Sequence, residues 1–236
     1  MHVRPFFLIP VIAVAMQGQS FADDQSILAV GSGRHWSDSL TKEKDKNYDE
    51  ALEETLAFLR EGGDALLGNE RTGWLKYLKG DQNGAEQAYS NANKMMPSAI
   101  TPLLGLLNVA KAQKDPKKIE RAAQAVLRLT PSNYNAQMAI AAMYFEAKDY
   151  NRAASQYQRV LTLYPDDVDV MSGEAWSYYY LGYKREANEL FRTIVNVIPD
   201  YLYAQRGIEL TTKSVKESSA NARPMATPNT PGLSRP

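Results

Sequence analysis

Residue types that commonly carry enzyme chemistry are scarce in this chain of 236 residues. It contains no cysteine, which excludes disulfides, thiolate nucleophiles, thiolate metal ligands and a lipidated cysteine anchor. Its two histidines are His2 and His35, so we expect neither a metal site built from several histidines nor a Ser-His-Asp triad. His35 lies beside Trp36 in a polar stretch, and we interpret it as a solvated side chain.

Two further patterns give only weak signals of chemistry. The segment 30–33 contains two glycines, but no Gly-Lys-Ser/Thr follows it, so we interpret it as a linker and not as a phosphate loop. The acidic clusters lie at a predicted helix start or in a loop, where solvated carboxylates are normal; they are Asp49, Glu50, Glu53 and Glu54, and Asp166, Asp167 and Asp169. We therefore expect no catalytic residues, no metal ligands, no cofactor and no enzyme activity.

Charge and the N-terminal segment limit the compartment and the class of partner. Lys plus Arg number 27 and Asp plus Glu number 27, so no strong field would attract nucleic acid or an anionic membrane. Arg4 precedes an apolar run over residues 5–16 and then small residues up to Ala22, which predicts a signal peptide over residues 1–22. The run is shorter than the roughly 20 residues that span a bilayer. We expect export to the periplasm, with secretion as the alternative, and no membrane insertion after cleavage.

The positions that organise the rest of the chain repeat every 34 residues. Prolines recur at this interval, at Pro97, Pro131, Pro165 and Pro199. A second set of positions with the same period lies twelve residues before the proline position of each repeat. These positions hold Ala51, Ala85, Ile119, Ala153 and Ala187. One period in two registers indicates an internal structural repeat.

The segment 134–167 shows what one repeat contains. Residues 135–146 have high helix propensity, and Lys148 and Asp149 form a turn signal. A second helix is predicted from about 150 to 164, where apolar residues recur at helical spacing, and Pro165 ends it. Each repeat is therefore predicted to be an antiparallel helix pair.

In period and in the placing of small, aromatic and proline residues, the chain resembles the tetratricopeptide-repeat (TPR) family. The matching repeats are 66–99, 100–133, 134–167 and 168–201. The repeat 100–133 departs most, because Ile119 stands at the small position and Ala123 at an aromatic one. The resemblance implies an all-α fold, a right-handed α-solenoid of antiparallel helix pairs.

The ends of the array differ from its repeats. Residues 47–65 are predicted to form a partial repeat helix, after a polar linker or irregular extension over 23–46. A capping helix is predicted over 202–218, because a terminal repeat needs a cover for its apolar face. The proline-rich tail 219–236 is predicted to be disordered.

The resemblance also implies that the first helix of each pair lines a concave groove for a partner protein or peptide. Carried over to this sequence, it implies as groove residues Glu70, Trp74, Tyr77, Leu104, Asn108, Lys111, Met138, Phe145, Trp176, Tyr179 and Arg206. Ala142 and Ser172 hold the two remaining places in this register. Some members of the family bind a peptide carboxylate with Lys, Asn and Arg; here Glu70 stands where a cation would help, so we expect an aromatic and apolar groove.

Two interpretations are open for the aromatic residues, partner binding and packing within the array. The alternative to a partner-facing role for Trp74, Trp176, Tyr77, Phe145 and Tyr179 is packing within the array. Packing is the expectation for Tyr144, Tyr157, Tyr178 and Phe191. Since Tyr178, Tyr179 and Tyr180 are consecutive, at least one of them should be partly exposed.

Together these features predict an exported scaffold for protein–protein interactions, in a role such as bacterial envelope assembly or secretion. The alternative is a structural protein whose repeat arrays associate into a homo-oligomer. Nucleic acid is not an expected partner.

Overall fold

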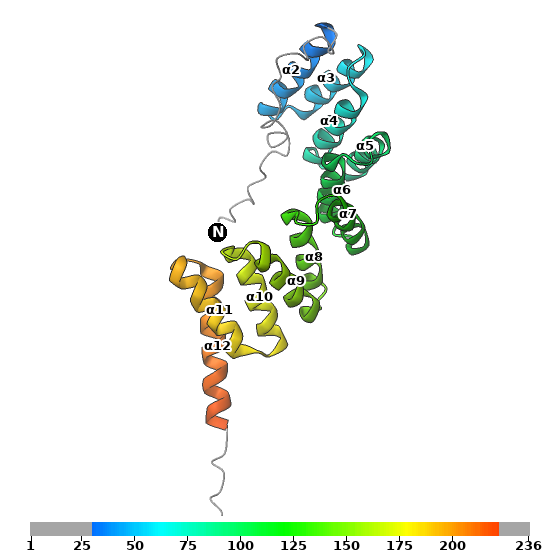
Figure 1. The fold of residues 1–236 in the computed structure, drawn as a ribbon. Helices are drawn as coiled ribbons and strands as arrows, with labels where there is room; N and C mark the ends of the chain where they lie inside the picture. Colours follow the sequence, from blue (N-terminus) through cyan, green and yellow to red (C-terminus); the bar gives the residue numbers. More distant parts are fainter. Residues whose placement is uncertain (1–29, 222–236) are drawn as a thin grey trace, which may run out of the picture. The chain divides into compact units, whose positions relative to one another are not determined.

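The computed structural model describes residues 30–221, and within that range the chain forms eleven helices and no strands (Figure 1). The chain divides into two compact units, residues 1–139 and 140–236. Each unit is described by itself below. The predicted signal peptide lies outside the described residues. Of the tail predicted to be disordered over 219–236, residues 219–221 are helical and belong to the last helix, and the remainder lies outside the described residues.

Unit 1 contains the N-terminal helix pairs, and helix α8 crosses from it into unit 2. The helices of unit 1 are α2 (Val30–Lys44), α3 (Tyr48–Arg60), α4 (Ala65–Leu78), α5 (Gln82–Met95), α6 (Ile100–Gln113) and α7 (Pro116–Leu129). The remaining helices are α8 (Tyr134–Glu146), α9 (Tyr150–Leu163), α10 (Val168–Leu181), α11 (Lys184–Val197) and α12 (Leu202–Asn221). Packing between consecutive helices dominates both units, so the expected all-α helical repeat is confirmed.

Capping residues with the same 34-residue period start the second helix of each pair. The side chains of Asn47, Asp81, Asp115 and Asp149 each accept a hydrogen bond from a backbone N–H of the first turn. Such a side chain satisfies one of the four donors that a helix start leaves unpaired. The next position in this register is Tyr183, which makes no side-chain cap for α11.

The repeated prolines set where the second helices end. The residue before each proline is the C-cap, with φ between −139° and −127° and ψ between 70° and 89°. These residues are Met96, Thr130, Tyr164 and Ile198. Because a following proline disfavours the α conformation, the helix stops there in every repeat.

Aromatic rings that pack against glycines join neighbouring helix pairs. A Cβ at Gly105 on α6 would lie 2.5 Å from Cδ1 of Tyr89 on α5, and a Cβ at Gly207 on α12 would lie 2.5 Å from Cζ of Phe191 on α11. The divergent repeat has Ala123 and Ala139 at the equivalent places, both buried. The large–small pair is thus replaced by two small residues.

The first helices of successive pairs also touch within each unit. Helix α4 lies against α6 in unit 1, and α10 lies against α12 in unit 2. Among the described helices, no two second helices pack to a similar extent. The first helices are therefore the more closely spaced layer in each unit, which is the layer that the resemblance assigned to the groove.

The prediction of an irregular extension over 23–46 is wrong for residues 30–44, which form α2 and pack antiparallel to α3. Polar contacts hold part of this interface: the hydroxyls of Ser39 and Thr55 are hydrogen-bonded at 2.9 Å, and both residues are buried. Because part of the surface between α2 and α3 is polar, the sequence pattern did not indicate that these two helices pack together. The predicted partial helix 47–65 is α3, so with α2 it completes a further helix pair.

His35 is not the freely solvated side chain that we expected. Its Nδ1 lies 2.5 Å from Glu54 Oε2 and its Nε2 lies 3.1 Å from Glu61 Oε1. The hydrogen bond with Glu54 is the main cause that raises the pKa of His35. Burial opposes it to a lesser extent, and the hydrogen bond with Glu61 also raises the pKa. His35 therefore ties α2 to α3.

The core residues follow the expected register in most places. Ala51, Ala85, Ala153 and Ala187 are fully buried, and Ile119 is buried in the departing position. Among the aromatics expected to pack, Tyr157 and Phe191 are buried, whereas Tyr144 and Tyr178 are half-buried. In the described part of the chain, no helix combines the length and apolar character needed to cross a membrane.

Candidate functional site

The predicted groove residues lie on first helices in both units. Unit 1 contributes Glu70, Trp74, Tyr77, Leu104, Asn108, Lys111 and Met138, and unit 2 contributes Phe145, Trp176, Tyr179 and Arg206. Lys111 and Arg206 are exposed and the others are half-buried. Of the two additional places in this register, Ala142 is half-buried and Ser172 is buried.

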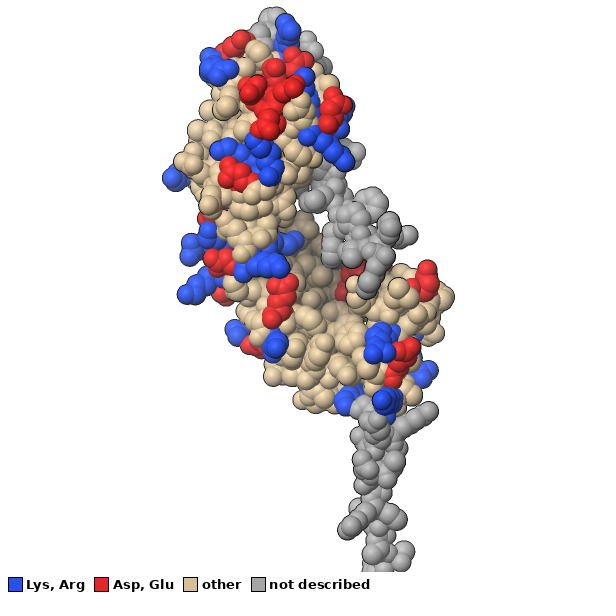
Figure 2. Space-filling model, turned by 180° about the vertical axis from the view of Figure 1, so that it is seen from behind, with Lys and Arg blue, Asp and Glu red and all other residues tan. Residues whose placement is uncertain are grey.

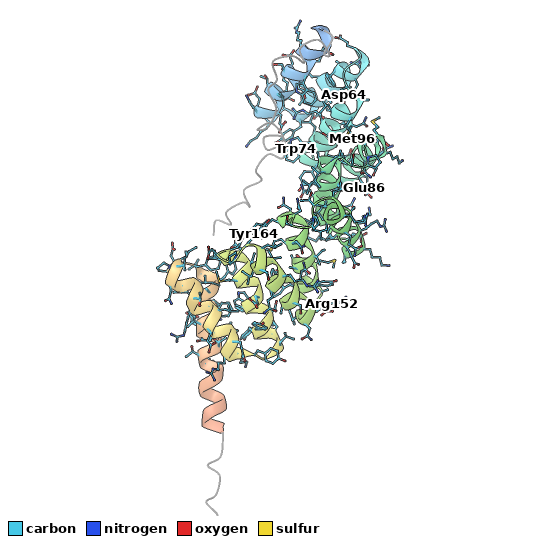
Figure 3. The ribbon with its side chains drawn as sticks, in the orientation of Figure 1. Asp64, Trp74, Glu86, Met96, Arg152 and Tyr164 are labelled. Atoms are coloured by element: carbon cyan, nitrogen blue, oxygen red, sulfur yellow. The ribbon has the colours of Figure 1, made fainter. Side chains whose placement is uncertain are left out.

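Trp74 is anchored within unit 1. Its indole Nε1 donates a hydrogen bond of 2.7 Å to Glu43 of α2, and its ring stacks on Tyr77 with 5.9 Å between ring centroids. Both rings pack against the buried residues Ala85, Tyr89 and Val109. Figure 3 labels the position of Trp74 on α4. This tryptophan therefore holds α2, α4 and α5 together, and its polar group is already satisfied.

A buried arginine beside Trp74 was not identified in the sequence. The Arg71 side chain has no exposed surface and pairs with Glu43. Its Nε also donates to Ser39 Oγ at 3.0 Å, and its Nη2 donates to the Ser39 carbonyl at 2.8 Å. Because buried charge is stable only when paired and hydrogen-bonded, this network is structural. The sequence feature that could have indicated this network is the small polar residue Ser39 on α2.

Glu70, one turn before Trp74, lies in a different electrostatic setting. Burial raises the pKa of its carboxyl to about 7, and the nearby charge of Asp64 acts in the same direction. Among the described residues, no cation forms an ion pair with Glu70. A carboxyl group with this pKa changes charge near neutral pH.

In unit 2, aromatic rings form a connected cluster at the C-terminal ends of α8 and α10 and the start of α9. We call Phe145, Tyr150, Trp176, Tyr179 and Tyr180 the aromatic cluster. The Tyr150 and Tyr180 rings stack with centroids 4.7 Å apart, and the Phe145 ring meets Tyr180 edge-on at 5.9 Å. The Trp176 ring lies 5.5 Å from Tyr179 and 6.1 Å from Tyr180. The structure thus brings the predicted residues Phe145, Trp176 and Tyr179 together, with Tyr180 at the centre.

The cluster is rigid on one side and open on the other. The Trp176 ring packs edge-on against buried Phe191 at 5.0 Å, so core residues fix the base of the cluster. Tyr180 is 52% exposed. Tyr150 and Tyr180 were not among the predicted site residues, although the tyrosine run 178–180 carried the signal. Exposed aromatic rings on a fixed base supply large contact area with little loss of side-chain entropy.

Arg206 gives no support for a carboxylate clamp, because its guanidinium already pairs with Glu209 on its own helix at 2.8 Å.

Acidic and basic side chains lie interspersed over the face of the molecule shown in Figure 2. Among the described residues, no three His, Asp or Glu side chains are grouped as metal ligands would be. The chemistry available at the aromatic cluster is apolar and aromatic contact.

Comparison with known proteins supports the fold at the level of structure. No protein-family model and no curated protein matches the sequence. A tetratricopeptide repeat protein from Parabacteroides merdae is similar in structure, with a TM-score of 0.70 and 14% identity over 83% of this chain and 82% of that one. MamA from Desulfovibrio magneticus RS-1 has a TM-score of 0.66 and 14% identity, covering 74% of this chain and 98% of that one.

A thermophilic TPR protein from Thermus thermophilus has a TM-score of 0.52 and 14% identity, covering 77% of this chain and 98% of that one. At such identities the likeness establishes the fold alone. The chain has the helical-repeat fold seen in TPR proteins.

Proposed function

We propose that this protein is a non-enzymatic scaffold that binds a partner protein through the aromatic cluster of unit 2. The observation that supports this most directly is the contact chain from Phe145 through Tyr180 to Trp176, fixed from below by Phe191 and open to solvent at Tyr180. Tyr and Trp are the side chains that most often carry the binding energy of protein interfaces.

The predicted signal peptide and the lack of net charge add a cellular setting to the proposal. The scaffold acts after export, in the periplasm, in assembly of the cell envelope or in secretion. A fusion of residues 1–30 to a reporter that is active only outside the cytoplasm tests this part. Reporter activity that depends on the apolar run supports export, and activity confined to the cytoplasm contradicts it.

Binding is tested by photo-crosslinking in the native host. A photoreactive phenylalanine analogue is placed at position 180 in the aromatic cluster or, as a control, at Leu163, which is 48% exposed at the end of α9. Crosslinking of one distinct protein from position 180 and not from 163 supports the proposal. A Tyr150→Ala change in the position-180 variant should weaken that crosslink, because Tyr150 stacks on residue 180.

Self-association is a second candidate, favoured by the apolar residues at the junction of α11 and α12. Val197 is 66% exposed, Leu202 is 74% exposed and Tyr203 is 67% exposed. Exposed apolar side chains that lie close together in the chain often belong to an interface. Light scattering across a range of protein concentrations decides this point: a mass that rises above that of one chain, and falls back in Leu202→Ser, favours self-association.

A further inference from the structure

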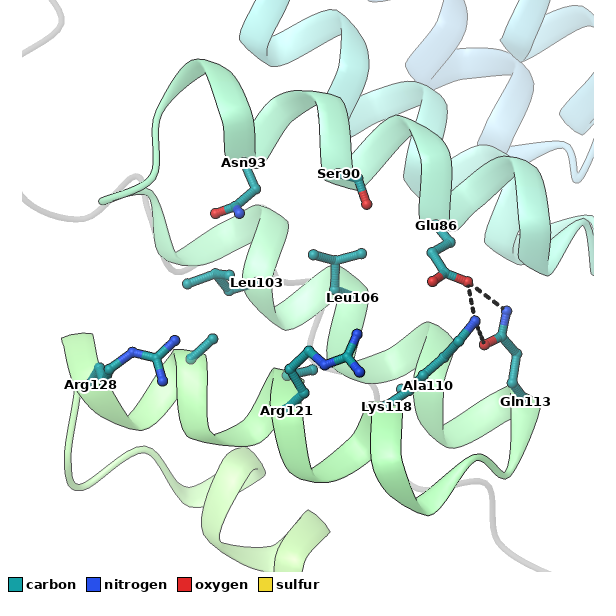
Figure 4. A pocket seen from close by; sticks show the side chains of 12 residues that line it. Glu86, Ser90, Asn93, Leu103, Leu106, Ala110, Gln113, Lys118, Arg121 and Arg128 are labelled. Carbon is teal, nitrogen blue, oxygen red and sulfur yellow. Dashed lines mark hydrogen bonds and ion pairs between the residues drawn. The ribbon is translucent and has the colours of Figure 1, made fainter.

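A recess opens on unit 1 between the second helices α5 and α7, with the first helix α6 as its floor (Figure 4). Its volume is about 310 Å³. Because α4 and α6 touch while α5 and α7 do not pack closely, the recess lies on the opposite side of the helical layer from the predicted groove. It is therefore separate from the groove residues of unit 1.

Two arginines on α7 project toward this recess without an acidic partner. Figure 4 shows Arg121 extending from α7 toward Leu106 of α6, and Arg128 running along α7 in the direction of Arg121. Among the described residues, neither forms an ion pair or a side-chain hydrogen bond. They lie seven positions apart, which is about two helical turns and about 10 Å along the axis. They form two separate cationic positions on one side of α7.

The one acidic side chain in the lining is already neutralised. Glu86 accepts hydrogen bonds from Lys118 Nζ at 2.6 Å and from Gln113 Nε2 at 3.0 Å, at the end of the recess away from Arg128 (Figure 4). These hydrogen bonds, above all the one from Lys118, hold the pKa of Glu86 below its usual value. The charge of Glu86 is therefore not available to either arginine.

The wall and floor between the arginines suit a polypeptide. Leu103 and Leu106 of α6 give an apolar floor between α5 and α7. The side-chain oxygen of Asn93 on α5 is buried and accepts no hydrogen bond from any described residue. This atom has almost no accessible surface, so the apolar floor, and not Asn93, is the contact that the recess offers between the arginines.

Repeat packing does not require these arginines. The equivalent positions one period earlier are Gln87 and Lys94, and one period later they are Ser155 and Thr162. The small residues Ala122 and Ala125 leave the recess open beside them. Arg121, Arg128 and the two alanines belong to the repeat 100–133, which departs most from the TPR pattern, and α5 on the other side of the recess belongs to the repeat before it.

We propose that this recess binds an acidic, extended segment of a partner protein, with one carboxylate on Arg121, a second on Arg128 and an apolar side chain over Leu103 and Leu106. An extended chain advances about 3.3 Å per residue, so acidic residues three positions apart match the spacing of about 10 Å between the two arginines along the axis of α7. Arginine pairs with a carboxylate through two parallel hydrogen bonds, which gives such a site geometric selectivity. A polyanion is a poorer match, because the chain has no net charge to attract it.

The test uses the purified full chain and a fluorescein-labelled peptide, Gly-Asp-Ala-Leu-Asp-Gly, in fluorescence anisotropy at low ionic strength. The protein should bind this peptide, and Arg121→Gln with Arg128→Gln should weaken binding about 10-fold or more. Arg159→Gln on α9 removes one exposed charge elsewhere and should leave binding unchanged. Circular dichroism confirms that each variant is folded.

Two further peptides test the geometry. Replacing both aspartates by asparagine should abolish binding, and placing the aspartates next to each other should weaken it. Equal binding of all three peptides, or of the double arginine variant and the parent, overturns the proposal.

Other occupants give different results in the same preparation. Arginine-dependent binding to vesicles of anionic lipid, without binding of the acidic peptide, overturns the proposal in favour of a membrane. A protein mass by light scattering that falls from two chains to one in the double variant overturns it in favour of a second copy.

Discussion

Gly173 on α10 leaves the space that the ring of Tyr157 on α9 fills: a Cβ at Gly173 would lie 2.5 Å from Tyr157 Cε1. We therefore expect Gly173→Val to destabilise the protein by about 1–3 kcal/mol through overpacking, measured by urea denaturation. Gly33→Val is the matched control, since nothing lies within 4 Å of a Cβ there. Equal stability of Gly173→Val and the parent would show that the ring does not fill this space.

Removing Glu43 should destabilise the N-terminal helix pair strongly. Arg71 would then keep a buried charge without its acidic partner, so Glu43→Ala should lose about 3 kcal/mol. Asp49→Ala is the control, because Asp49 pairs with Lys79 but its side chain is 77% exposed, and a loss within about 0.5 kcal/mol is expected. Denaturation followed by tryptophan fluorescence also reports the loss of the Trp74–Glu43 hydrogen bond.

The missing cap of α11 offers a stabilising change. Tyr183 occupies the N-cap register in which Asp149 accepts a hydrogen bond of 3.1 Å from the Arg152 N–H. Tyr183→Asp should therefore stabilise the protein by about 1 kcal/mol relative to Tyr183→Ala. The alanine variant accounts for the loss of the ring contact with Tyr178. Identical melting temperatures for the two variants would contradict this.

Glu70 should make stability depend on pH near neutrality. Its folded-state pKa of about 7 lies above the ordinary value of 4.5, so the folded state binds the extra proton between these values. Stability is therefore fully present below about pH 4.5 and decreases as pH rises through 7. Glu70→Gln should be more stable than the parent by on the order of 1 kcal/mol at pH 8, and equal to it at pH 4. Glu53→Gln, on the exposed side of α3, is the control and should match the parent at both pH values.

The fold could be predicted because its determinants are local and periodic. Pro97 and its equivalents end the second helices, and Ala85 and its equivalents allow close helix packing. The α2–α3 pair could not be predicted in the same way, because buried Ser39, Thr55 and Arg71 replace its apolar core with hydrogen bonds. Polar residues that satisfy one another have no periodic apolar signature.

The candidate site was predicted in part. Register placed Phe145, Trp176 and Tyr179 on first helices, but it did not show that Tyr180 joins their rings. It also did not show that Glu43 already binds the indole of Trp74. Both relationships depend on contacts between helices, which a 34-residue period does not encode.

The most direct test of the scaffold account is photo-crosslinking from position 180 in the native host, compared with position 163. The account predicts one distinct partner protein crosslinked from 180, absent from 163 and weakened by Tyr150→Ala. Crosslinking of the same proteins from both positions, or only of a second copy of this chain, would contradict it.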